Sequence, residues 1–184
     1  VLPKALTLRL IHLDEIVLRK TGIEPQGEPH MAPWLDFLER MDNAAETVTI
    51  GLVGKYVELQ DAYKSINEAL FQAATYNDHR LRLVSVHSEK INEGNVDALL
   101  GDMDGVVVAP GFGSRGIEGK FVALHWCRTH NIPTLGICLG MQCMVIEFAR
   151  NVMGLKGANS TEMDPNTSDN VIDLMEEQKS ITEK

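Results

Sequence analysis

The chain has 184 residues, 44% of them hydrophobic, and its formal net charge at pH 7 is −9. That length and apolar content suit one α/β domain with an appendage, and they exclude a disordered chain. The acidic balance, with no run of lysine or arginine, argues against a nucleic-acid-binding surface.

The first 45 residues are predicted to form a helical connecting arm. Apolar positions recur at helical spacing over residues 11–21, and a second amphipathic helix follows around Trp34 and Met41. Between them, residues 22–33 are rich in glycine and proline, which is typical of a linker. Charged residues interrupt the apolar start, so it is too short for a membrane span or a signal sequence, and we expect no membrane partner.

From residue 47 onward the pattern alternates between strand and helix. Strands are expected at 47–53, 81–86, 105–109 and 132–137, and helices at 63–76, 96–100, 117–130 and 141–151. This alternation predicts an α/β fold in three layers, a mostly parallel sheet with helices on both faces. The ligand site of such a sheet lies at the carboxyl ends of its strands. In the last helix, Met141, Met144 and Phe148 are expected to pack in the core.

Cys138 follows the last predicted strand and precedes the last predicted helix, with Gly136 and Gly140 on either side. This arrangement is typical of a nucleophile elbow, whose sharp turn needs small residues two positions away from the nucleophile. The N-terminus of the following helix favours a thiolate there. The alternative is a buried structural cysteine, which we expect for Cys127 and Cys143. Three cysteines without paired or metal-binding spacing indicate a reducing, cytoplasmic setting and no metal site.

A glycine-dense turn, residues 110–116, follows the strand at 105–109 and is expected at the same sheet edge as Cys138. Acyl transfer needs two N–H donors that face the developing oxyanion. Gly111 and Leu139, the residue after the nucleophile, are the candidates. By itself the turn could equally be an ordinary strand-to-helix connection or a phosphate cradle.

The six histidines offer no well-placed base for this thiol. Only His87, at the carboxyl end of the strand at 81–86, shares the correct sheet edge, and the residues after it fit a turn or helix start. His125 and His130 lie on the helix that leads to the opposite edge. The general base that a cysteine nucleophile normally uses is therefore not evident in this sequence.

Residues 136–142, Gly-Ile-Cys-Leu-Gly-Met-Gln, closely resemble the active-cysteine signature of class I (triad) glutamine amidotransferases. Longer segments are similar to one family of this class, the CTP synthases. These segments are residues 51–63, 113–120, 145–152 and 157–162. Residues 13–18 resemble the arm that joins the synthase and glutaminase domains of that family.

The resemblance implies a flavodoxin-like fold in which Cys138 attacks the side-chain amide of L-glutamine, forms a glutamyl thioester and releases ammonia. It further implies that Gln142 and Glu162 hold the amino-acid head of the substrate, with Gly111 and Phe112 also lining the site. From the residues alone, Gln142 could be a helix-surface amide and Glu162 a turn carboxylate.

For the parent enzyme, the resemblance implies ATP-dependent amination of UTP to CTP, with ATP and magnesium in a synthase domain, allosteric GTP and a homotetramer. No cofactor is expected in this chain. Residues 1–45 would be the arm from the synthase domain, and 46–184 the N-terminal part of the glutaminase domain. The family's His-x-Glu base would lie beyond Lys184, so we expect little glutamine hydrolysis by the chain alone.

One position departs from the family pattern. The family commonly has Gly-Gly-Phe-Gly in the oxyanion loop, and Pro110, which has no N–H, stands at the first glycine here. Two alternatives stay open: a catalytically incomplete binding or regulatory fragment, and another α/β hydrolase with a cysteine elbow.

Overall fold

A computed structural model describes residues 12–24, 27, 30–59 and 61–179. It divides into two compact units, residues 1–38 and 39–184. The two helices expected in the first 45 residues are present as α2 (Leu13–Thr21) and α3 (Ala32–Asn43), and the rings of Trp34 and Phe37 stack 5.6 Å apart on α3. No helix in the described part of the chain is long and apolar enough to cross a bilayer.

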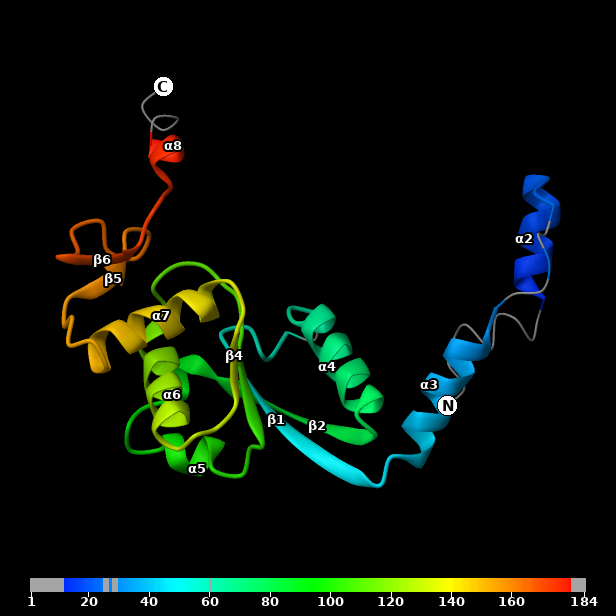
Figure 1. Cartoon of the computed structure of the whole chain (residues 1–184), viewed down its shortest axis with the longest axis horizontal. Helices are drawn as coiled ribbons and strands as arrows, with labels where there is room; N and C mark the ends of the chain where they lie inside the picture. Colours follow the sequence, from blue (N-terminus) through cyan, green and yellow to red (C-terminus); the bar gives the residue numbers. More distant parts are fainter. Residues whose placement is uncertain (1–11, 25–26, 28–29, 60, 180–184) are drawn as a thin grey trace. The chain divides into compact units, whose positions relative to one another are not determined.

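The second unit is built on a four-stranded sheet (Figure 1). Its strands are β1 (Glu46–Gly54), β2 (His79–His87), β3 (Gly105–Val108) and β4 (Thr134–Gly136), in the order β2-β1-β3-β4. Every neighbouring pair in this sheet is parallel. The expected strands are confirmed, although the last is shorter than its apolar pattern suggested.

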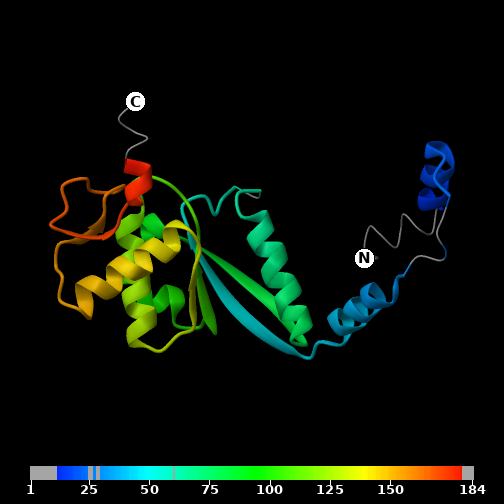
Figure 2. The same ribbon diagram turned by 45° about the horizontal axis from the view of Figure 1, so that its top comes forward.

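Helices cover both faces of this sheet, which confirms the three-layer α/β fold. Side chains alternate along β3, so Val106 and Val108 pack with α5 (Val96–Leu100), α6 (Ile117–Thr129) and α7 (Leu139–Asn151). Val107 faces the other way and packs with Tyr63 beside α4 (Lys64–Tyr76). Figure 2 shows α4 on one side of the sheet and α6 and α7 on the other.

Helix α7 differs from expectation in the side it buries. Met144 packs against the core, but Met141 and Phe148 are each 48% exposed, so the prediction that they belong to the core is wrong. The helix has two apolar stripes. The stripe that contains Cys143 and Ile146 is buried, and because Met141 and Phe148 lie about a third of a turn or more away from it, they face outward.

Three short elements were not expected from the sequence. They are the strands β5 (Ala158–Ser160) and β6 (Asp169–Ile172) and the helix α8 (Glu176–Lys179). The 3₁₀ turn η1 (Ser88–Lys90) is the turn or helix start that was expected after His87. β5 and β6 pair in parallel as a separate two-stranded sheet that contacts α7. Elements of three or four residues are too short to produce a recognisable hydrophobic period.

A buried carboxylate joins α6 to α7. Glu147, on α7, is 3% exposed and accepts hydrogen bonds from Arg128 of α6, of which the shortest run from Nη2 to Oε1 at 2.8 Å and from Nε to Oε2 at 2.9 Å. His125 and Asn151 lie at 3.0 and 3.1 Å from the same Oε1. Burial by itself raises the pKa of Glu147, but the hydrogen bonds from these three partners outweigh it and hold the pKa below its usual value.

We expect Glu147→Gln to lower the free energy of unfolding by about 2 kcal/mol at pH 7, because it removes the charge that Arg128 pairs with. Since the folded-state pKa is lowered, this stabilisation is present above the unfolded pKa and disappears as the pH falls through the folded one. Urea unfolding at pH 7 and at about pH 3.5 measures both effects. The exposed Glu93→Gln is the control, and equal losses in the two variants would contradict the prediction.

Candidate functional site

Cys138 occupies the junction between β4 and α7. Its backbone has φ 53° and ψ −113°, a conformation that residues other than glycine rarely adopt and that costs about 1–3 kcal/mol. The residue is exposed, whereas Cys127 and Cys143 are buried, as expected for structural cysteines. A strained, exposed thiol at the carboxyl edge of a parallel sheet is the geometry of a nucleophile elbow.

The glycines on either side permit this turn. A Cβ on Gly140 would lie 2.0 Å from the carbonyl oxygen of Val108, at the end of β3. A Cβ on Gly136 would lie 2.6 Å from the backbone of Gly140. Neither position has room for a side chain, which confirms the steric reasoning drawn from the sequence.

The glycine-dense turn after β3 lies beside the elbow, because Val108 of β3 pairs with Gly136 of β4. A Cβ on Gly111 would come within 3.6 Å of Leu139 Cδ2. Within the described residues, neither the Gly111 nor the Leu139 N–H donates a hydrogen bond. The structure thus brings Gly111 and Leu139, the two residues that the sequence singled out, close to each other, and it leaves both of their N–H groups available. The Phe112 side chain is 79% exposed.

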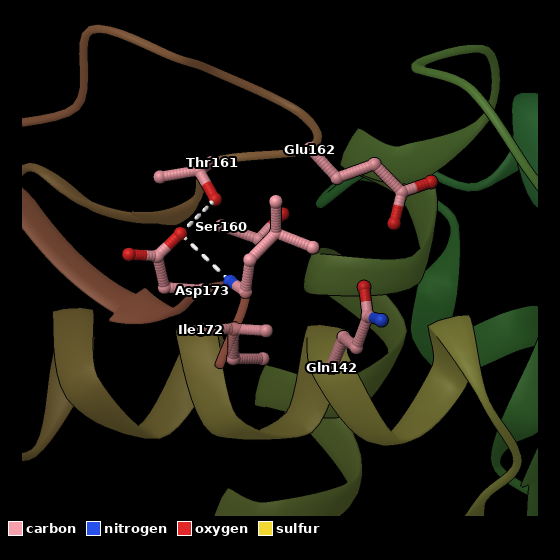
Figure 3. A pocket seen from close by; sticks show the side chains of 7 residues that line it. Gln142, Ser160, Thr161, Glu162, Ile172 and Asp173 are labelled. Atoms are coloured by element: carbon pink, nitrogen blue, oxygen red, sulfur yellow. Dashed lines mark hydrogen bonds between the residues drawn. The ribbon is translucent and has the colours of Figure 1, made fainter. Parts of the chain in front are cut away.

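A cavity of about 580 Å³ is lined in part by Gln142, which lies one helical turn beyond Cys138. Figure 3 shows the Gln142 and Glu162 side chains extending into one space from α7 and from the segment after β5. The Gln142 Oε1 atom is buried and has no hydrogen-bond partner in the described residues. An unsatisfied amide and a nearby carboxylate are suited to bind a small polar molecule.

The far wall of this cavity was missed from the sequence. It is formed by Ser160 at the end of β5, by Thr161 directly after it and by Asp173 after β6. Thr161 Oγ1 donates to Asp173 Oδ1 at 2.7 Å, and the Leu174 N–H donates to the same oxygen at 2.8 Å, which fixes this wall (Figure 3). Residues 157–162 resemble the CTP synthases and include Ser160 and Thr161, but a binding role was predicted there for Glu162 alone.

No histidine of the described second unit reaches Cys138. His87 ends β2, and since β1 and β3 lie between β2 and β4, it is separated from the elbow by about 14 Å of sheet; its Nδ1 accepts from the Glu89 N–H. His125 binds Glu147, about 13 Å along α7 from Cys138. His79 pairs with Glu46 at the amino ends of β2 and β1, the end of the sheet opposite Cys138, and His130 stacks on Trp126.

Comparison with protein families gives a match to the family described as Glutamine amidotransferase class-I, over residues 58–182. The chain is 62% identical to a CTP synthase of Porphyromonas gingivalis over 178 residues, which are 97% of this chain and 33% of that protein. It is 64% identical to a CTP synthase of Bacteroides fragilis over 170 residues, 92% of this chain and 32% of that protein. The chain thus spans about a third of the length of these curated relatives.

Among solved structures, the chain is similar to one described as the glutaminase domain of Trypanosoma brucei CTPS with bound acivicin. The TM-score is 0.65 and the sequence identity 38%, over 71% of this chain and 51% of that one.

The three thiols are expected to differ in reactivity. Burial raises the pKa of Cys127, and raises that of Cys143 to about 11, so at pH 8 only about one Cys143 in a thousand is a thiolate. Iodoacetamide should therefore alkylate exposed Cys138 at least about tenfold faster than the other two, as followed by peptide mass spectrometry. Cys138→Ala should abolish the fast phase, and persistence of that phase would contradict the assignment.

Proposed function

This chain belongs to the class-I glutamine amidotransferase family, and from that premise we propose that Cys138 is the nucleophile that releases ammonia from L-glutamine. The observation that carries the proposal is the juxtaposition at the elbow. An exposed thiol lies on a strained turn, and the adjacent strand leads into the turn that contains Gly111; within the described residues the N–H groups of Leu139 and Gly111 donate no hydrogen bond.

In the proposed reaction, the Cys138 thiolate forms a bond to the side-chain carbonyl carbon of glutamine, and the electron pair of the C=O bond moves onto oxygen. The N–H groups of Leu139 and Gly111 stabilise that oxyanion. Its collapse breaks the C–N bond, and the amide nitrogen takes up a proton and leaves as ammonia. Water then hydrolyses the glutamyl thioester, which yields glutamate and restores the thiol.

The cavity beside Gln142 is suited to the amino-acid head of the substrate. The Glu162 carboxylate can pair with the α-ammonium group, and the unsatisfied Gln142 Oε1 can accept a further hydrogen bond from it. Gln142 is one turn from Cys138, so a glutamine held at its α-carbon can extend its side-chain amide toward the thiol. Phe112 would line the same site through its backbone, next to Gly111.

We assign this glutaminase to a CTP synthase, on the strength of the identity to the Porphyromonas and Bacteroides proteins. In that enzyme the ammonia would pass to a synthase domain that aminates UTP with ATP and magnesium, under allosteric control by GTP. Residues 1–45 would form the connecting arm and 46–184 the first part of the glutaminase domain. A tetrameric, cytoplasmic enzyme of pyrimidine biosynthesis is the corresponding expectation for the whole protein.

Glutamine should compete with covalent capture of Cys138. We expect the chloroketone analogue of L-glutamine to modify Cys138 alone, through a new C–S bond with loss of chloride, and free L-glutamine to suppress the modification. Intact-mass and peptide mass spectrometry measure it, with D-glutamine as the matched competitor control. Equal suppression by both enantiomers, or none, would favour a binding fragment or a different cysteine hydrolase.

Turnover by the 184-residue chain should be slow, because the histidines of the second unit lie away from the thiol and the lack of a general base costs about 10²–10⁴-fold in rate. Ammonia release from glutamine, followed with a coupled glutamate dehydrogenase assay, measures this rate. Turnover at about 1 s⁻¹ or faster, typical of intact enzymes, would contradict the expectation.

A further inference from the structure

Two buried lysines lie beneath the glycine-dense turn. Lys120, on α6, has no exposed surface, and Lys55, just after β1, is 6% exposed. Lysine is almost never buried to this extent without a partner, because the ammonium loses its hydration. Their burial therefore needs an explanation in what the two ammonium groups bind.

Both ammonium groups bind carbonyl oxygens of the same turn. Lys120 Nζ donates to the Ala109 oxygen at 2.7 Å, and Lys55 Nζ donates to the Phe112 oxygen. These two carbonyls lie on either side of Pro110 and Gly111. The Gly111 N–H thus belongs to a two-residue segment whose flanking carbonyls are both held by ammonium groups.

Gly111 itself lies against the same groups. A Cβ placed on it would be 3.7 Å from Lys55 Cε, 4.0 Å from Lys120 Nζ and 3.6 Å from Leu139 Cδ2. The Lys120 ammonium thus lies close to Gly111, one of the two residues proposed to bind the oxyanion. Burial lowers the pKa of Lys120, the Cys143 thiol raises it, and the nearby Lys55 and Cys138 act in opposite directions.

The backbone of the turn provides little support of its own. The Ala109 N–H donates to Val53 and the Ile117 N–H to Ser114, and no other backbone hydrogen bond in the described structure involves residues 110–116. Pro110 has no N–H to contribute. Side chains therefore hold a segment that secondary structure does not: the two ammonium groups at one end, and the ion pair between Arg115 and Glu89 at the other.

We infer that Lys120 is a positioning residue: by holding the Ala109 carbonyl, with Lys55 holding that of Phe112, it orients the Gly111 N–H toward the substrate carbonyl attacked by Cys138. The inference rests on the proposed glutaminase chemistry for its catalytic consequence. Its structural part, that the ammonium immobilises residues 110–116, stands independently of that chemistry.

Lys120→Met tests both parts, because methionine keeps most of the length and volume but cannot donate. Lys64→Met, which changes an exposed lysine of α4, is the matched control. Amide hydrogen exchange of Ile117, whose N–H donates to Ser114 in the turn, should rise about tenfold or more in Lys120→Met, with β1 unchanged. Unchanged exchange in Lys120→Met would overturn the inference. Failure of glutamine to protect the wild-type thiol is a separate result, and it would count against the proposed function.

Two electrophiles separate positioning from a general structural role. The chloroketone reacts through an oxyanion. In the reaction with iodoacetamide, the thiolate displaces iodide directly and no oxyanion forms. Lys120→Met should slow the chloroketone reaction at Cys138 by about 10- to 100-fold, and change the iodoacetamide rate less than about threefold. Equal loss with both reagents, or no loss with either, overturns the inference. Lys120→Gln, with a shorter polar side chain, provides the same comparison if the methionine variant does not fold.

Discussion

The contact on which the site depends is between backbones: the first turn of α7 lies against the carboxyl end of β3. A Cβ on Gly140 would come within 2.0 Å of the Val108 oxygen, so only a glycine permits this approach. It brings the start of the helix to the end of the adjacent strand, which places the turn after β3 next to Cys138. The close relation between Gly111 and Leu139 follows from this single packing constraint.

The sheet, the helices on its two faces and the position of Cys138 could all be predicted from the sequence, because each has a strong local cause. Apolar runs of the β3 type mark buried parallel strands, and glycines around a cysteine mark a tight turn. Long-range features could not be predicted in this way. The cavity wall at Thr161 and Asp173 depends on two short strands that pair across a loop, and no local period indicates them.

The exposed side of α7 shows a second limit of pattern reasoning. Met141 and Phe148 have helical spacing and apolar character, yet the helix buries Cys143 and Ile146 instead. A hydrophobic period shows that a helix has an apolar face, but it cannot decide between two such faces. Likewise, nothing local indicates that Lys120 is buried. Its partner, the Ala109 carbonyl, belongs to a different element and is found only after folding.

The way α7 begins has a consequence for stability. Cys138 takes the N-cap position without forming a side-chain cap, whereas serine, threonine or aspartate there typically stabilises a helix by about 1 kcal/mol. A capping side chain would accept from the N–H of the second or third helical residue, Gly140 or Met141, and the Leu139 N–H would take no part in it. Because a thiol and not a capping side chain stands at residue 138, this helix gives up part of its own stability, and the packing of Leu139, Cys143 and Ile146 in the core must hold it in place. Reactivity at one end of α7 is thus sustained by burial along the rest of it.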